Sequence, residues 1–425
     1  MGKLGLAFKD QWAQAVDSFK TWLSASSVVM LAVSKTKEAV TELKEIDTIL
    51  TEISKTNDKL SKSDLKNIGN NAFETASKYG KKATDYLSGV QEASRAGYEN
   101  AGNIAELSTA AQGAGDMTAE LANSYIIATD KAYGMEGSVQ KLTQTLDGAN
   151  EITNHNAVNM TELAEGMKVV GSQAASSQIS VEETTAALGT LIAVTQQGGS
   201  QMGNAFKGIL MNLRQVTGEV DGEEIDQESL TKYEKACEAL GVSLSEVKDG
   251  AVSLKEPMQI LKELSAEYTK LDKDDAKRAN LLSAIGGKYR ANALNAILEN
   301  WSTYENMLQQ YADGDGSMAE EAEKTANSLE GSLNKLSNTW TDTVQNVLDS
   351  DTLNSGVKVL NTVLDLINKI TDKLGLFGTA GVTIGTILGV KNVGKANYIS
   401  NFHCFEYADS IYNSIGYDSL EYAKS

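Results

Sequence analysis

The chain has 425 residues, a length that suits two or three domains, and its 57 acidic and 38 basic residues give a formal net charge of −19. This charge disfavours direct nucleic-acid binding by the surface, because affinity for nucleic acids comes from neutralising phosphates. Two cysteines are too few for a disulfide framework. One proline and an aromatic content of 6% favour helices over strands. We therefore expect an all-α protein, with elongated long helices or coiled-coil segments flanking a compact multi-helix core and at most one small β-hairpin.

The N-terminal part predicts two helical segments. Residues 7–33 carry four bulky rings on one face, which indicates contact with the core or with a partner helix, with a membrane surface as the alternative. A heptad pattern runs from Thr36 to Leu60, and Ser61–Asp64 is predicted to end it. This pattern suits either a helix packed inside its own domain or a seam that binds a partner helix. The candidate seam residues are Leu43, Ile46, Leu50, Ile53 and an Asn at an a position, Asn57.

Residues 64–150 predict helices of ordinary length, arranged as stacked helical hairpins. Similar Met-Thr steps at Met117 and Met160 precede two of these helices and suggest a weak repeat. Breaks between the helices are expected at glycines, namely Gly80, Gly102, Gly113 to Gly115, Gly134 and Gly137.

Residues 160–216 predict three helices separated by two turns. Ser180 and Glu183 form an S-x-x-E capping box before the second helix, and Gly198-Gly199-Ser200 breaks the chain before the third. The third helix has the clearest apolar face, at spacings of three and four residues. The core residues expected on that face are Met202, Phe206, Ile209, Leu210 and Leu213.

The next segment changes in character. Residues 218–228 hold six acids and no base, which is typical of a solvated loop. Asp249-Gly250 between short apolar runs predicts a hairpin, in competition with a helix capping box at Ser243 and Glu246. Pro257 suits the first position of a new helix.

A second capping box, Ser317 and Glu320, is expected to open a long helix. Its predicted seam is Leu329, Leu333, Leu336, Trp340, Val344 and Val347. A further stripe in strict coiled-coil spacing is a second candidate partner seam, made of Val357, Leu360, Leu364 and Ile367.

The C-terminal part has two unusual segments. Residues 374–390 are uncharged and contain five glycines, which suits either a core segment or a short membrane span. Residues 397–425 are rich in aromatics and do not continue the helical pattern, as a truncation or a shifted reading frame would produce.

The sequence offers little for catalysis. We find no phosphate-binding glycine loop, nucleophile elbow or HExxH motif, and two histidines, His155 and His403, give little basis for a metal site. Residues 313–317 hint at a calcium loop, but the positions that need Gly and Glu hold Met318 and Lys324. Cys237 lies beside Glu234 and Glu238, whose charges would raise the pKa of the thiol. We therefore predict no catalytic, metal or cofactor-binding residue.

The central helices resemble the core region of bacteriophage tail tape measure proteins of the TP901-like type. The likeness rests on three runs, Glu162–Leu191, Gly198–Leu213 and Glu256–Leu298, and extends over most of 37–372. Gly199-Ser200-Gln201 matches the Gly-Ser-Gln turn of that family. Met202-Gly203-Asn204 stands where the family favours Ala-Gly-Thr, and Arg214 matches its helix-end arginine.

The resemblance implies a structural protein of the virion tail lumen, made in the bacterial host cytoplasm, that sets tail length and is expelled to assist DNA entry. It implies the major tail tube protein and tail assembly chaperones as partners, self-association through helices, and contact with the host inner membrane on ejection. An alternative function is that of a membrane-active helical protein inserting through 374–390. An enzyme is disfavoured. The expected divisions are 1–63, a core at 64–312 with the acidic loop 218–228, long helices at 313–373, the Gly-rich segment 374–396 and the tail 397–425.

Overall fold

The computed structural model describes residues 25–57, 60–213, 227–248 and 251–348. In this part of the chain the predicted all-α fold is confirmed, with helices throughout and one two-stranded sheet. Contacts divide the chain into two units. The larger is Thr48–Lys335, and the smaller joins the residues up to Asp47 with those from Leu336 onward.

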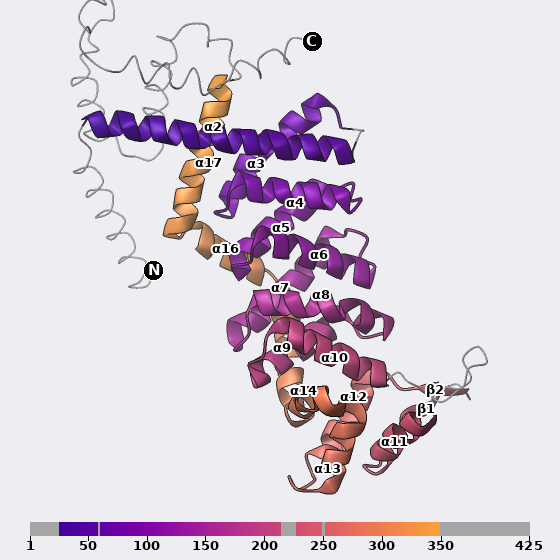
Figure 1. The fold of residues 1–425 in the computed structure, drawn as a ribbon. Coiled ribbons are helices and arrows are strands. Elements are labelled where there is room, and N and C mark those ends of the chain that lie inside the picture. The colour runs from indigo at the N-terminus through magenta and orange to yellow at the C-terminus, as the bar shows by residue number, and fades with distance from the viewer. Residues whose placement is uncertain (1–24, 58–59, 214–226, 249–250, 349–425) are drawn as a thin grey trace, which may run out of the picture. The chain divides into compact units, whose positions relative to one another are not determined.

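The larger unit is a stack of helices in two adjoining rows (Figure 1). Successive helices alternate between the rows, so that each helix packs on the one two positions earlier in the chain. This arrangement agrees with the stacked hairpins expected from the sequence. One row consists of α4 (Ala83–Arg95), α6 (Ala119–Tyr133), α8 (Met160–Ser176) and α10 (Gly199–Leu213), and the other of α5 (Ala101–Gly115), α7 (Val139–His155) and α9 (Val181–Thr195).

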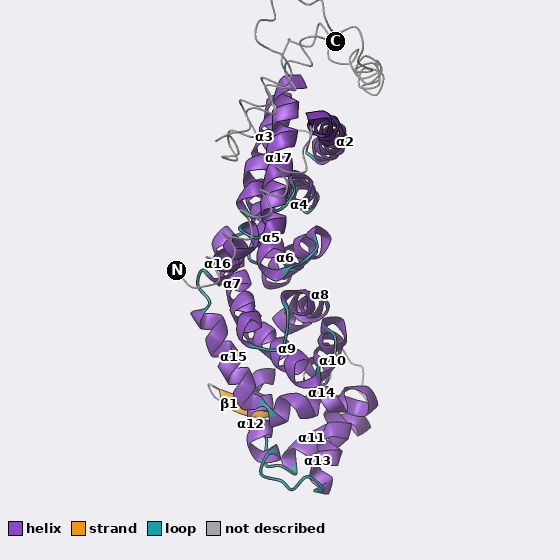
Figure 2. Ribbon diagram, turned by 90° about the vertical axis from the view of Figure 1, so that its left-hand side faces the viewer, coloured by secondary structure: helices purple, strands orange, loops and turns teal. Residues whose placement is uncertain are grey.

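The chain then turns and runs back along the stack. After α12 (Pro257–Tyr268), the helix α13 (Ala276–Leu281) leads into a π-helical turn, η1 (Leu282–Gly286), and α14 (Gly287–Glu299). Helix α15 (Trp301–Asp313) packs on α9 and α7, and α16 (Ser317–Ala326) packs on α7 and α5, as Figure 2 allows the reader to follow. Residues 301–326 therefore lie beside α5, α7 and α9.

A short hairpin interrupts the helices. Strand β1 (Ser245–Lys248) pairs antiparallel with β2 (Ala251–Leu254), with Ser245 opposite Leu254, after α11 (Gln227–Glu238). The predicted hairpin is confirmed, and the competing capping box is not formed. The hydroxyl of Ser243 instead accepts a hydrogen bond from the N–H of Ser245, 3.3 Å away.

Several predicted boundaries agree with the structure and others are displaced. The central three helices and the Pro257 start of α12 are confirmed. Helix α2 (Ala25–Thr56) ends before Asn57, and Ser61 with Asp64 caps the next helix, α3 (Lys62–Lys78), rather than ending α2. Gly102 lies inside α5, because the chain turns earlier, at Gly97 with φ +87°.

The predicted long helix beginning at Ser317 is two helices, α16 and α17 (Leu329–Leu348), separated by Asn327 and Ser328. On α17 the predicted seam is buried only in part, since Val344 is buried but Leu329 and Leu333 are exposed. The residues buried on α17 include Asn338, Thr341 and Val344. This difference arises because tertiary contacts, rather than apolar periodicity, select the buried face of this helix.

The smaller unit brings α2 and α17 together through a mixed contact. Ala39, Ile46 and Val344 are buried there, and the hydroxyl of Thr341 donates to Glu42 Oε2 over 2.8 Å. In the described residues no helix is long and apolar enough to cross a membrane. The candidate segment 374–390, the aromatic-rich tail and most of the acidic loop lie outside the described residues.

Candidate functional site

The contact between α8 and α10 is made by glycines. A Cβ built on Gly199 would lie 1.8 Å from the carbonyl oxygen of Glu162, and one on Gly203 would lie 2.6 Å from that of Gly166. These glycine hydrogens therefore face backbone carbonyls of α8 directly, at a separation that no other residue allows. Gly199 and Gly203 are four residues apart, as are Glu162 and Gly166, so the contact extends over one turn of each helix.

This geometry explains the glycines in the Gly-Ser-Gln turn and in the step that follows it. Gly199 and Gly203 are needed because α10 starts against the backbone of α8. The left-handed residue of the turn that joins α9 to α10 is Gln196, with φ +54°. The glycine pair thus serves helix packing rather than turn formation.

Capping boxes fix where two of these helices begin. The predicted box at Ser180 and Glu183 is confirmed, with the Glu183 N–H 3.2 Å from Ser180 Oγ and the Ser180 N–H 3.0 Å from the Glu183 carboxylate. A second box, Asn159 with Glu162, begins α8. It brings the Glu162 backbone to the first turn, where Gly199 meets it.

The predicted apolar face of α10 is turned into the stack. All five residues named for it from the sequence are buried, whereas Met211 on the opposite side is 47% exposed. The buried residues are Met202, Phe206, Ile209, Leu210 and Leu213.

A second contact, between α7 and the start of α16, is polar. Asp147 on α7 accepts hydrogen bonds from the N–H groups of Gly316 and Met318, at 3.1 and 3.0 Å. This carboxylate caps α16 from a distant part of the chain, and it replaces the predicted box, since neither Ser317 nor Glu320 caps the helix. Burial raises the pKa of Asp147, the two N–H groups act against that rise, and the nearby Asp315 carboxylate adds to it.

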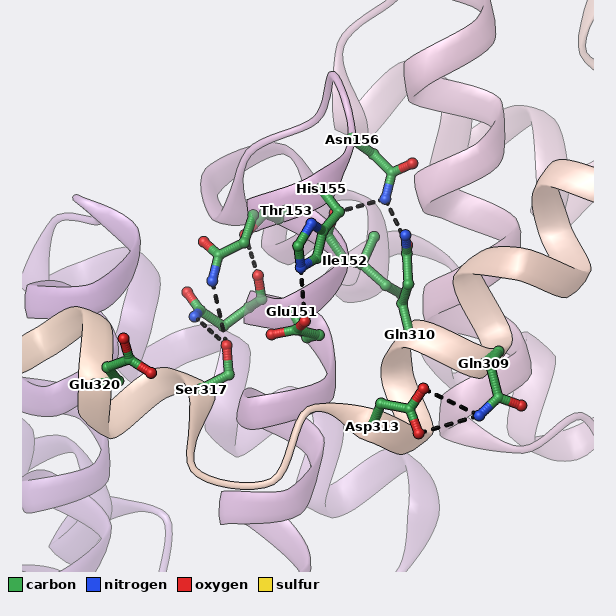
Figure 3. A network of polar contacts seen from close by, with 12 residues as sticks. Glu151, Ile152, Thr153, His155, Asn156, Gln309, Gln310, Asp313, Ser317 and Glu320 are labelled. Carbon is green, nitrogen blue, oxygen red and sulfur yellow. Dashed lines mark hydrogen bonds and ion pairs between the residues drawn. The ribbon is translucent and has the colours of Figure 1, made fainter.

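Ser317 lies at the centre of this polar contact. Its hydroxyl accepts from the side-chain amides of Asn150 and Asn154, at 2.9 and 3.2 Å (Figure 3). Asp147, Asn150 and Asn154 follow one another at three and four residues, so they share one face of α7. Asp147 and Asn150 are buried although they are polar, and polar residues at this spacing on one helix face are the signal from which a polar partner could have been inferred.

The same end of α7 has further links to α15. Asn156 donates to Gln310 Oε1 over 2.7 Å, and His155 forms a hydrogen bond with Glu151 within α7 (Figure 3). Tyr311 lies flat on Gly148, where a Cβ would come within 2.5 Å of the ring. Asn156, Ser317 and Gly148 together fasten the returning chain to the stack.

The arrangement offers no evident reacting group. The one buried carboxylate of this contact is occupied by backbone donors, and the described residues contain no group of three or more metal-ligating side chains. Burial raises the pKa of the Cys237 thiol to about 12, with Glu234 and Glu238 adding to the effect, which confirms the predicted direction.

The candidate partner seams have different environments. On α2, Ile46 and Ile53 are buried, Leu43 and Leu50 are half-buried, and Asn57 follows the last residue of the helix. Leu50 packs beside Gly69 of α3. The second seam, Val357, Leu360, Leu364 and Ile367, lies outside the described residues, so binding of a partner helix to either seam stays a prediction.

Comparison with known proteins gives a family but no structural neighbour. No solved structure matches the chain. A family model described as "Phage-related minor tail protein" matches residues 69–287, just over half of the sequence. The match begins in α3 and ends where α14 begins, and it includes both helices of the glycine contact. The chain therefore belongs to the family of phage-related minor tail proteins.

Proposed function

We propose that this protein is a tail tape measure protein, or a piece of one, which sets the length of a phage tail during assembly. It would lie in the tail lumen while the major tail tube protein polymerises around it, with tail assembly chaperones assisting. It would then be expelled as DNA enters the cell. The observation that carries the proposal is the family match, supported by the resemblance of the α8–α10 region and of Glu256–Leu298 to tape measure proteins.

The described structure supports a structural role rather than a catalytic one. Its buried polar groups join helices to one another, as Asp147 and Asn150 do. Helices also suit a ruler, since each residue adds a fixed rise of about 1.5 Å, so the whole chain as one helix would span at most roughly 640 Å. The folded stack of Thr48–Lys335 uses its residues in compact packing instead.

We infer that the ruler consists of the uninterrupted helices outside the stack. Helix α2, which begins outside the stack and reaches into it from Thr48 onward, is continuous over 32 residues, which corresponds to about 48 Å of rise. The helices of the stack between Lys62 and Ala326 have at most 17 residues each and fold back on one another.

The test is to insert heptads where the two units join. One to four heptads are added both after Asp47 in α2 and after Lys335 in α17, which removes no residue from either unit. Each added pair should lengthen the tail by about 10 Å in electron micrographs. As a control, the same number of residues placed as a flexible loop between β1 and β2 should leave tail length unchanged.

The outcome distinguishes the ruler function from membership of the tail protein family. Assembled tails of constant length after the paired insertions would refute the ruler function and leave membership of the tail family intact. Tails that also lengthen after the loop insertion would show that length does not depend on continuous helix.

A further inference from the structure

Of the five large apolar side chains exposed on the described surface, four lie in two places. Tyr289 is 88% exposed on the first turn of α14, and Met211 is 47% exposed on the neighbouring α10. Leu329 and Leu333 are 55% and 53% exposed on the first two turns of α17. Exposed apolar groups of this kind, when charges surround them, mark sites of protein association.

The first group has basic neighbours, and we call it the basic patch: Lys207, Met211, Lys288, Tyr289 and Arg290. Its two helices are joined, because the guanidinium of Arg290 lies against Gly208, where a Cβ would be 2.5 Å from Nη1. In addition, the Asn212 amide donates to the carbonyl of Ile285 over 2.5 Å.

The backbone beside Tyr289 is irregular. The π-helical turn η1 ends at Gly286, and Gly287 follows with φ +59°. Such turns are uncommon and often occur at functional positions. Here the turn precedes the most exposed of these large side chains.

The cations of the basic patch have no acidic partner in the part of the chain that the structure describes. Lys207, Lys288 and Arg290 form no ion pair with any acid among the described residues, although the chain has 57 acids and 38 bases. In so acidic a chain, a patch of three unpaired cations around an exposed ring is suited to an acidic apolar surface.

The second group carries one unpaired acid among exposed leucines. We call it the acidic stripe: Leu329, Glu330 and Leu333. Leu333 lies three and four residues beyond the other two, so the three side chains are neighbours on α17. Glu330 is exposed and has no ion-pair partner in the part of the chain that the structure describes, whereas the nearby Lys324 is paired with Glu320 and Glu321.

One copy cannot bring these two surfaces together. The beginning of α17 lies at the α3–α4 end of the stack, where the Asn334 amide donates to the carbonyl of Gly80 over 2.9 Å. Helix α14 packs on α9, α10 and α12, at the other end of the stack.

We propose that the basic patch of one copy binds the acidic stripe of a second copy. The two surfaces differ, so the contact is head-to-tail, and successive copies form a ring or a continuing filament. Tyr289 is the central apolar anchor, with Lys288 and Arg290 beside Glu330 of the next copy. This contact does not depend on the ruler function.

The first test is sedimentation velocity of the full chain over a range of concentrations. We expect association that weakens as salt is raised. Tyr289→Ser and Leu333→Ser should each weaken it by about tenfold or more, as truncation of an interface anchor does. Val194→Ser, which changes a 39% exposed residue outside both surfaces, is the matched control and should have no effect.

A charge exchange tests the pairing itself. The double variant Lys288→Glu with Arg290→Glu, and the single variant Glu330→Lys, should each associate weakly alone. Mixed together they should associate again, because the altered patch of the first then meets the altered stripe of the second. Circular dichroism confirms that each variant is folded.

A wild-type chain that stays monomeric at the highest attainable concentration would overturn the proposal. So would association that survives both apolar substitutions, since it would then use other surfaces. Failure of the mixed variants to associate, with each folded, would overturn the pairing of patch and stripe.

Discussion

The α8–α10 and α7–α16 contacts join helices of the same stack by opposite means. The first places the glycines of α10 against the carbonyl groups of α8, and no side chain lies between them. The second is built from side chains, with Asp147 and two asparagines reaching the start of α16. The glycine contact therefore has no room for an added side-chain atom, whereas the polar contact depends on the side-chain atoms that it has.

The largest effect is expected for Gly199→Ala. The new methyl group would meet the Glu162 carbonyl at 1.8 Å, and both are backbone, so the helices must separate. We expect a loss of about 3 kcal/mol in the free energy of unfolding, measured by urea denaturation. A destabilising effect would by itself support the close contact, because Gly→Ala in an unhindered helix stabilises by up to about 1 kcal/mol.

The matched control for that variant is Gly198→Ala. A Cβ on Gly198 has no heavy atom within 4 Å. The stability should stay within about 0.5 kcal/mol of the wild type. Equal effects at Gly198 and Gly199 would show that close approach of the helices is not what glycine provides here.

The next largest effect is expected for Asp147→Ala, which leaves the N–H groups of Gly316 and Met318 without their acceptor. We expect a loss of about 2 kcal/mol. Hydrogen exchange of those two amides should accelerate more than that of the α8 amides. Asp313→Asn, at an exposed position that contacts Gln309, is the control, and an equal loss there would contradict the capping role.

A smaller effect is expected for Ser317→Ala, which removes the acceptor shared by Asn150 and Asn154. The expected loss is about 1 kcal/mol in thermal or urea unfolding. Ser176→Ala is the comparison, because that exposed hydroxyl only donates to the Gln173 carbonyl of its own helix. If both serines cost the same, the polar contact contributes nothing beyond local bonding.

The smallest effect concerns pH. The pKa of Asp147 is raised above 3.8, its ordinary value, so the folded state holds this proton more tightly than the unfolded state does. Its contribution to stability is therefore present at low pH and is lost as pH rises through the raised pKa. The stability of the wild type relative to Asp147→Asn should fall over that interval, and urea titrations at several pH values would measure it. A relative stability that rises instead would mean that the N–H donors outweigh burial.

The same two contacts show what a sequence can predict. The helices α8, α9 and α10 were predictable because apolar spacing and the Ser180–Glu183 box are local signals. The start of α16 at Ser317 was predicted as well, but its cap was not, because the acceptor that caps Gly316 lies 169 residues earlier in the chain. Ser317 and Glu320 have the spacing of a capping box, but a distant carboxylate takes that position.

Helix α17 shows that apolar spacing is likewise insufficient when distant parts of the chain decide the contacts. Its leucine stripe predicted a buried seam, but Leu329 and Leu333 are exposed while Asn338 and Thr341 are buried. Hydrophobic periodicity shows which face could be buried, and the neighbouring helices decide which face is. The sequence predicted these glycines as a break in the chain. Their role in helix packing follows only from the position of the Glu162 carbonyl opposite Gly199.

The return of the chain along the stack has a mechanical consequence. Gly80 lies against Ala326 and Gly331, so the Thr48–Lys335 unit is entered and left at the same end. A force that pulls the two flanking segments apart would act first on that end. It would act on the Gly199–Glu162 contact only later. Helices would then detach a few at a time under modest tension. A chain drawn through a narrow tube could in this way unfold stepwise, without one large barrier to overcome.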